Sequence, residues 1–187
     1  MPQTSRILNI ELHDFWHVGN GEGMGSGLDS VVRRNRWGLP VLPGRELKGI
    51  LKDSAKCLES WGHIPKGTVD RLFGCNGRDG EIRVSNADLD KNDSLVLMPS
   101  NSADVRSALF CDLFSTAIDH KSGNAKNKSL RGMEVVVPCI LQAEITCDVN
   151  SKGSFELIER FLPLTRAVGS DRNRGLGRCT MTFNNEE

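Results

Sequence analysis

The sequence has no tyrosine, few aromatic residues and no long apolar run, and each absence excludes a class of protein. Aromatic residues make up only 5% of the chain, and no predicted strand carries the two or three exposed aromatics of an ordinary RNA-recognition sheet. No run of about 18 apolar residues is present, so we expect no membrane span. The start of the chain shows no signal-peptide pattern, so we expect a cytoplasmic protein.

The cysteines also lack a pattern that would indicate a metal or redox site. None of the six forms a CxxC pair, and without a secretion signal we expect free thiols in a reducing cytosol. Cys57, His63 and Cys75 lie near one another in sequence, but their spacing is not that of a zinc finger. Because free cysteines are commonly buried, we expect core cysteines here and no zinc site.

The formal net charge is zero, which by itself argues against a nucleic-acid-binding protein. The charge is segregated, however. Residues 31–56 hold seven Lys/Arg against two acids, residues 120–131 hold four against none, and residues 160–178 hold five against one, whereas residues 79–112 hold seven acids against three basic residues. One face could therefore accept phosphates and another could meet a basic neighbour. Solvated faces without any partner would give the same runs, so both interpretations stay open.

The periodicity of apolar residues predicts an α+β domain. We expect strands at 7–13, 81–89, 134–137, 140–148 and 179–184, and helices from Pro43-Gly44 to Trp61-Gly62 and over 155–167, the second kinked at Pro163. Residues 90–102 are interpreted as a polar loop. Without insertions, the order is strand, helix, strand, strand, helix, strand, which is the ferredoxin-like βαββαβ arrangement in a single domain spanning 1–187. This fold hosts many functions, so it does not identify one.

The first stretch with chemical meaning is residues 39–52, where two prolines and a glycine open a helix. A helix N-terminus presents free N–H groups to an anion. Arg45, Lys48 and Lys52 follow at spacings of three and four, which puts them on one face. The pattern suits an RNA phosphate, and it also suits a surface helix with a basic face.

The second stretch is residues 169–178, which precede the closing strand. Glycines allow close backbone approach to a ligand, and consecutive amides can form an anion-binding nest. Arg172 and Arg174 lie inside this loop. A plain connection between elements seldom needs so many glycines and arginines, so we interpret it as a candidate phosphate-binding loop.

The third stretch is residues 25–34, where Asp29 follows a flexible glycine-rich loop and precedes Arg33 and Arg34. A single carboxylate cannot support two-metal catalysis alone. It could hold one divalent ion beside an RNA phosphate, or position a 2′-hydroxyl for in-line attack. An aspartate in a loop is more commonly a turn or cap residue, and that alternative remains.

In this order, these stretches resemble the RAMP superfamily of CRISPR proteins, and within it the repeated backbone subunit of type III (III-A, III-B or III-D-like) complexes. The resemblance covers nearly the whole chain. It rests on these segments: Trp16-His17-Val18-Gly19, 28–33, 42–49, 72–74 with 82–87, 117–126, 134–138 and 169–177. Departures from the family pattern are Arg45-Glu46 in place of Ser-Ser, Asn86 in place of Asp, and Leu130-Arg131 in place of Leu-Phe.

The resemblance implies a subunit that binds guide RNA (crRNA) and target RNA, stacks with copies of itself in a filament and joins other CRISPR effector subunits in a prokaryotic cytoplasm. A β-hairpin thumb, here about residues 117–137, would reach over the guide–target duplex and flip a target nucleotide at every sixth position. Asp29 would cut target RNA there with Mg²⁺ or Mn²⁺. The implied RNA-binding residues are His17, Gly19, Arg33, Arg34, Arg45, Lys48, Lys52, His120, Lys121, Lys126, Lys128, Arg131, Gly169, Ser170, Arg172, Arg174 and Gly175.

Three alternatives remain at this stage. The chain could be a subunit of the same kind that binds RNA without cutting it. It could be a guide-processing endoribonuclease of the superfamily, with a histidine as general acid or base; the candidates are His13, His17, His63 and His120. It could also be an unrelated ferredoxin-like binding module. The Asp29 loop and the thumb favour the two backbone-subunit hypotheses, because processing relatives usually lack both.

Overall fold

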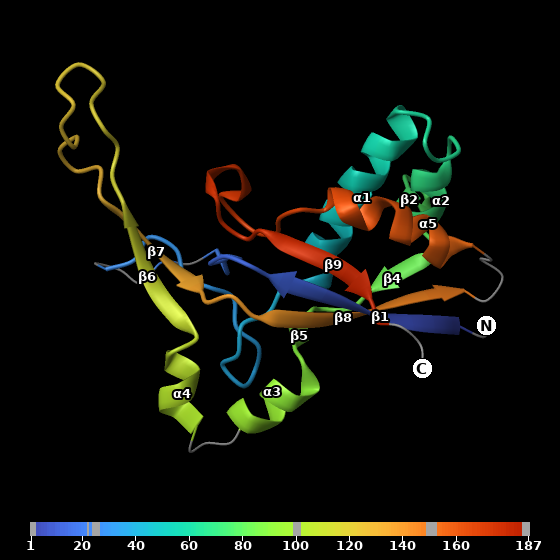
Figure 1. The fold of residues 1–187 in the computed structure, drawn as a ribbon, viewed down its shortest axis with the longest axis horizontal. Coiled ribbons are helices and arrows are strands. Elements are labelled where there is room, and N and C mark those ends of the chain that lie inside the picture. The colour runs from blue at the N-terminus through green and yellow to red at the C-terminus, as the bar shows by residue number, and fades with distance from the viewer. Residues whose placement is uncertain (1–2, 22, 24–26, 99–101, 149–152, 185–187) are drawn as a thin grey trace.

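The computed structural model describes residues 3–21, 23, 27–98, 102–148 and 153–184. Its palm is an antiparallel sheet with the strand order β4-β8-β1-β9, and β5 pairs with β8 beside β4. The palm elements are β1 (Gln3–Leu12), α1 (Gly44–Ser60), β4 (Ile82–Val84), β5 (Asp88–Leu89), β8 (Ile140–Asp148), α5 (Ser154–Phe161) and β9 (Cys179–Phe183). Helices α1 and α5 cover one face of the sheet, as Figure 1 shows. The predicted ferredoxin-like arrangement is confirmed.

The palm forms because alternate residues of its central strands are apolar. In β1, Leu8, Ile10 and Leu12 are buried while the residues between them face outward. In β8 the buried positions likewise alternate, from Leu141 to Cys147. Alternation of this kind gives a sheet with one face packed under helices and one face free for other elements. The central pairing therefore follows directly from the sequence pattern.

Several insertions decorate the palm. They are α2 (Thr68–Phe73), the hairpin β2 (Gly74–Cys75) and β3 (Arg78–Asp79), α3 (Lys91–Leu97), α4 (Ala103–Ser107), β6 (Phe110–Ser115), β7 (Arg131–Val136) and the 3₁₀ turns η2 (Leu162–Leu164) and η3 (Arg172–Arg174). Strands β6 and β7 pair with each other in a separate two-stranded sheet. This hairpin, with residues 116–130 at its tip, projects away from the palm in Figure 1, and we call it the thumb.

Two predictions about this half of the chain need correction. The thumb begins at Phe110 and not near residue 117, and its second strand begins at Arg131, three residues before the strand predicted at 134–137. The segment 90–102 is not only a polar loop, because it contains α3. The Asp90 side chain accepts a hydrogen bond from the Asp93 amide at 2.8 Å. That N-cap starts a helix too short for its apolar period to be evident.

The strand predicted over 81–89 is broken into β4 and β5. Between them, the Ala87 amide and carbonyl pair with Leu42, at 2.8 and 3.0 Å. The segment leaves β8 because the start of α1 lies against it. A Cβ atom on Gly44 would lie 2.3 Å from the Val84 carbonyl oxygen. Gly44 is therefore required for close backbone approach, whereas the sequence suggested only a turn.

The second helix also ends earlier than predicted. It spans Ser154–Phe161, and Pro163 lies in the 3₁₀ turn that follows. Proline lacks the N–H that an α-helix needs and its ring clashes with the preceding turn, so the helix stops there and is not merely kinked.

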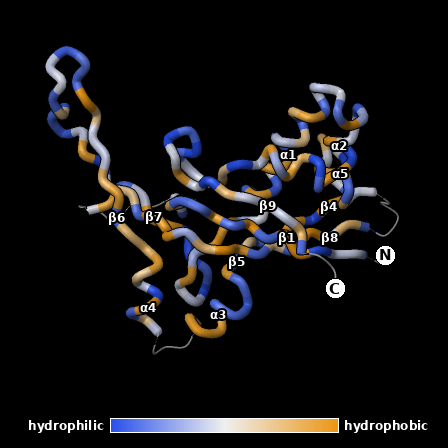
Figure 2. The backbone as a smooth tube through the Cα atoms, viewed as in Figure 1, coloured by the Kyte–Doolittle hydropathy of each residue, from blue (hydrophilic) through white to orange (hydrophobic). Residues whose placement is uncertain are grey.

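No helix in the described part of the chain is both long and apolar enough to cross a membrane. Figure 2 shows apolar segments along the palm strands and the base of the thumb, whereas the tip of the thumb and the loop before β9 are mostly hydrophilic.

Two glycines of α1 provide a stability prediction. We expect Gly44→Ala to lower the free energy of unfolding by about 1–3 kcal/mol, because the added methyl overlaps backbone that cannot move freely. Gly49→Ala is the matched control. Nothing lies within 4 Å of a Cβ at Gly49, so alanine there should raise helix stability by about 0.5–1 kcal/mol. Urea unfolding followed by circular dichroism measures both, and equal effects would contradict the assigned packing.

Candidate nucleic-acid interface

His17 joins three segments that are far apart in sequence. Its Nδ1 lies 2.6 Å from the Glu134 carbonyl oxygen on β7, and its Nε2 lies 2.9 Å from the Ser30 hydroxyl. Its own carbonyl accepts from the Ser170 amide at 2.8 Å. A carbonyl only accepts, so Nδ1 carries the proton, and in the neutral ring Nε2 accepts from Ser30. We call these four residues the His17 junction.

The His17 side chain is 2% exposed. The resemblance implied an RNA contact at this position, but the ring has both nitrogens engaged within the protein. Gly19 lies just beyond, in a bridge with Val32. Both residues thus hold the loops together beneath the candidate interface.

Asp29 lies at the base of the thumb. Its amide donates to the Gly132 carbonyl at 2.8 Å, and the Gly132 amide donates to its Oδ2 at 2.9 Å. The next carbonyl, that of Ser30, accepts from the Glu134 amide at 2.9 Å. Asp29 is exposed and only Oδ2 is hydrogen-bonded to the described residues. The carboxylate is therefore fixed to β7 and still open to solvent.

Glu134 is the functional residue that the sequence analysis missed. It is 7% exposed, and its carboxylate accepts from the Val32 amide at 2.9 Å and from Arg34 at 2.7 Å. The Arg34 guanidinium also lies 3.9 Å from the centre of the Phe110 ring. Arg34, an implied RNA ligand, thus braces the base of the thumb. A carboxylate amid the apolar residues of a predicted strand was the available signal for Glu134.

Residues 169–177, the glycine loop, fold against the His17 junction. Gly169 has a φ of +76°, and a Cβ there would lie 2.1 Å from the His17 carbonyl oxygen, so only glycine fits. Ser170 contacts the junction through its amide. Gly175, at φ +93°, reverses the chain after η3. Arg172 and Arg174 are exposed on this turn, and Arg174 lies 3.7 Å from Asp171.

The basic residues of α1 do not all face the glycine loop. Lys48 donates to the Ile82 carbonyl and Lys52 to the Gly74 carbonyl, both at 2.8 Å. They line a polar hollow of about 530 Å³ that Arg78 and Arg83 also line. Burial, followed by repulsion from Lys52, lowers the pKa of Lys48. The hollow therefore carries excess positive charge.

Arg45 is exposed at the start of α1, whereas its neighbour Glu46 lies within electrostatic reach of Arg172 and Arg33. Burial raises the pKa of Glu46, although both arginines oppose that shift. The acid that replaces a serine of the family pattern thus lies where positive charge gathers. The predicted single basic face is divided between this side and the side of Lys48 and Lys52.

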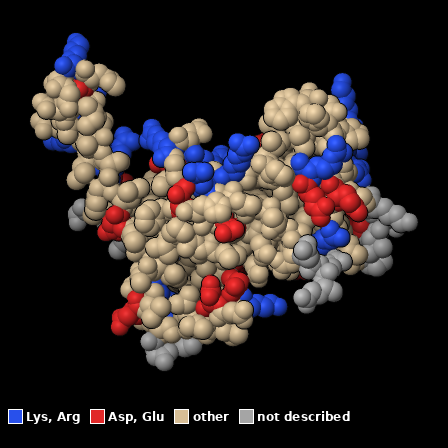
Figure 3. Space-filling model, in the orientation of Figure 1, with Lys and Arg blue, Asp and Glu red and all other residues tan. Residues whose placement is uncertain are grey.

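The thumb presents the remaining predicted cations. His120, Lys121, Lys126, Lys128 and Arg131 are all exposed. Asp119 organises the tip by accepting from the amides of Lys121 and Ser122, which lowers its pKa. Figure 3 shows Lys and Arg at the thumb tip, over the glycine loop and towards the α1 end of the molecule. Acidic side chains lie along the lower edge, at the base of the thumb and in a cluster at the right, beside the α5 end.

The four histidines considered for guide processing lie at separate places in the structure and do not form one site. His13 lies 2.8 Å from the Thr180 hydroxyl at the edge of the palm. His63 follows α1 and meets Trp61 edge-on. His120 is at the thumb tip, and His17 is buried. Together with its occupied nitrogens, the burial of His17 disfavours a histidine-based reaction there.

No group of three or more His, Cys, Asp or Glu residues in the described ranges is placed to hold a metal ion. Asp29 alone is thus not a protein-built metal site. Its carboxylate does suit Mg²⁺ or Mn²⁺ if an RNA phosphate and water complete the coordination, because Mg²⁺ in phosphoryl-transfer sites uses one or two carboxylates with substrate phosphates.

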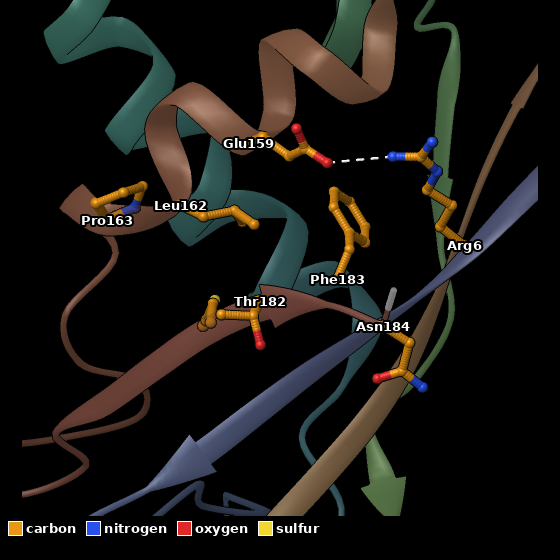
Figure 4. Close-up of a pocket in the computed structure, with 8 residues that line it drawn as sticks. Arg6, Glu159, Leu162, Pro163, Thr182, Phe183 and Asn184 are labelled. Carbon is orange, nitrogen blue, oxygen red and sulfur yellow. Dashed lines mark hydrogen bonds and ion pairs between the residues drawn. The ribbon is translucent and has the colours of Figure 1, made fainter. Parts of the chain in front are cut away.

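A second hollow, of about 560 Å³, lies between β9 and α5 and is drawn in Figure 4. Arg6 and Glu159 face each other across it at 3.1 Å, and Arg6 also lies 6.0 Å from the centre of the Phe183 ring. Because the charges of Arg6 and Glu159 offset each other, this hollow attracts an RNA backbone only weakly. The interface with excess positive charge is the side of the glycine loop, α1 and the thumb.

Comparison with known proteins agrees with this fold. A chain in the cryo-EM structure of the type III-B Cmr-beta bound to cognate target RNA superposes with a TM-score of 0.76 and 13% identity, covering 96% of this chain and 97% of that chain. A chain in the apo state of Cmr-beta gives 0.73 and 13%, covering 97% and 98%. No curated protein matches the sequence. The model of the RAMP superfamily matches residues 9–180, and the chain belongs to that superfamily.

Proposed function

We propose that this protein is a crRNA-binding backbone subunit of a type III CRISPR ribonucleoprotein. The observation that carries the proposal is the His17 junction, which brings the glycine loop, the Asp29 loop (residues 27–32) and the base of the thumb to one place. Membership of the RAMP superfamily and a fold shared with chains of Cmr-beta support it. A guide held by one part would lie beside a target gripped by the others.

The guide would be bound by its phosphates. Arg172 and Arg174 lie on a loop of exposed backbone, and α1 offers Arg45 beside Gly49. A mid-helix glycine is destabilising, and no protein atom packs against this one. An open Gly49 would let a phosphate chain approach the helix backbone closely. Binding of this kind is electrostatic and independent of sequence, with target recognition left to base pairing.

Stacking of copies into a filament would use the opposite, acidic side. Helices α3 and α4 carry three exposed apolar residues, Leu95, Val96 and Val105, at 71, 69 and 58% exposure. Asp93 and Asp104 lie on the same two helices. We assign this α3–α4 face to contact with the basic side of the next copy. A head-to-tail contact between unlike faces gives an open filament where the rotation from one copy to the next does not close into a ring.

Target cleavage would occur at Asp29. Its open carboxylate would hold one divalent ion against a target phosphate, which would stabilise the charge that develops in in-line attack. A scaffold that binds RNA without cutting it is the second candidate, because the described residues form no group of three or more His, Cys, Asp or Glu that could hold a metal ion.

We expect Arg174→Glu to weaken binding of guide RNA and to reduce the slope of log affinity against log salt concentration by about one or more, because at least one phosphate contact is lost. Lys91→Glu, on α3, is the control with the same change in net charge, and it should bind as the wild type does. Fluorescence anisotropy over a salt series measures both. An equal loss of RNA affinity in the two variants would show a general effect of net charge and would contradict a phosphate contact at Arg174.

We expect Asp29→Ala to abolish regular cleavage of target RNA by the assembled complex in Mg²⁺ or Mn²⁺, with binding of guide and target retained. EDTA should have the same effect on the wild type. Denaturing gels of end-labelled target report the cuts, which the proposal spaces six nucleotides apart. Intact binding without any cutting by the wild type would establish the scaffold alternative.

We expect Val96→Asp to reduce assembly of several copies on long guide RNA, while binding of one copy to short RNA stays the same. A charge in the apolar α3–α4 face would have to lose water on docking. Val96→Ala keeps the face apolar and serves as the control. Sedimentation velocity on RNAs of two lengths separates the two effects, and undisturbed assembly of Val96→Asp would rule out this face.

A further inference from the structure

We propose that the groove between α1 and residues 164–173 binds one nucleotide of single-stranded RNA, with its base stacked on Trp61 and its phosphate held by Arg166 and Arg172. The groove has a volume of about 630 Å³, within the range of roughly 300–1,000 Å³ common to ligand pockets. This inference rests on the proposed RNA-binding function and extends the RNA path beyond the glycine loop.

Trp61 has the exposure that a stacking platform needs. It is 61% exposed at the C-cap of α1. Its backbone N–H donates a hydrogen bond to the Cys57 carbonyl, which holds the backbone there. Of the other tryptophans, Trp16 is fully buried. Trp37 is 40% exposed, but the Arg36 guanidinium covers its ring at 3.9 Å. Trp61 instead meets His63 edge-on, with ring planes at 86°.

The groove also supplies charge for a phosphate. Arg166 and Arg172 are exposed, and neither lies within ion-pair distance of a carboxylate in the described part of the chain. The acid in the groove, Asp53, is paired with Lys56 at 3.1 Å, which reduces its repulsion of an anion. Guanidinium groups suit phosphate oxygens because they can donate two parallel hydrogen bonds.

A buried hydrogen bond lies at the floor of the groove. The hydroxyls of Ser54 and Thr165 bond to each other at 2.8 Å, and both residues are buried. This contact ties α1 to the segment that follows α5, so the two backbone segments that form the groove are joined at its floor. Asn173 adds an amide at the rim, with a donor and an acceptor for a base edge.

The position of the groove favours RNA over an acidic peptide. Arg172 belongs to both the groove and the glycine loop, so the groove adjoins the proposed phosphate-binding surface of that loop. A base has a π-face that stacks on an indole regardless of its identity, which suits a guide of variable sequence.

The test uses the full chain in a Trp37→Phe background, so that Trp61 is the one exposed tryptophan among the described residues. Titration with a short oligouridine should quench its fluorescence in a saturable way. We expect Trp61→Ala to weaken binding at least about fivefold and Trp61→Phe to stay within about twofold of the parent, because a ring still stacks. Because Trp61 is exposed, we expect both variants to stay folded, and thermal melts check this.

The outcomes separate the inference from the function on which it rests. Absence of RNA binding by the parent chain would overturn both. RNA binding that Arg174→Glu weakens but Trp61→Ala leaves unchanged, with no quenching, would overturn the nucleotide site alone. Quenching by an acidic peptide in place of RNA would show that the groove takes a protein partner and would also overturn it.

Discussion

The candidate interface depends on one buried imidazole. The His17 ring lies within hydrogen-bond distance of a carbonyl of the thumb through Nδ1 and of a hydroxyl of the Asp29 loop through Nε2, so one side chain engages both segments. Its backbone carbonyl holds the glycine loop. Loss of the ring would leave buried polar groups without partners, at about 1–3 kcal/mol each. Backbone hydrogen bonds also join these segments, between Trp16 and Val136 and between Asp29 and Gly132. The His17 ring and the Glu134 carboxylate add the side-chain contacts that tie the same segments together.

Much of the palm could be predicted from the sequence, because its alternating and helical patterns report burial directly. Strand β8 has the predicted bounds, Ile140–Asp148, and α1 begins at the predicted Gly44. Failures occurred where a long-range contact decides the structure. The 81–89 strand breaks because Leu42 competes with β8 for Ala87. The start of the thumb at Phe110 was missed because its exposed strand shows no alternation of burial.

The same reasoning explains the mixed outcome for the site. His17 lies in a segment that resembles a family motif, and Arg34 directly follows another, but a motif does not say whether a polar side chain faces the ligand or holds the loop that does. Here both are engaged within the protein, at Glu134 and at the His17 junction. Arg172 and Arg174 are exposed, as a phosphate-binding role requires. Glu134 could be suspected from its place beside the apolar residues of a predicted strand, but its partners, the Val32 amide and the Arg34 guanidinium, follow only from the structure.

The attachment of Asp29 bears on why cleavage would need the assembled complex. Both its amide and its Oδ2 bind Gly132, so the carboxylate moves with β7. The thumb extends from the palm as a hairpin, and nothing in the described chain supports its tip. In an isolated chain the base of the thumb holds the carboxylate, but no target phosphate is aligned with it, and reactive geometry tolerates little displacement. A guide–target duplex gripped by the thumb would restrain both together. The proposed catalytic group would then be aligned by the substrate that it cuts, without a second protein element devoted to that purpose.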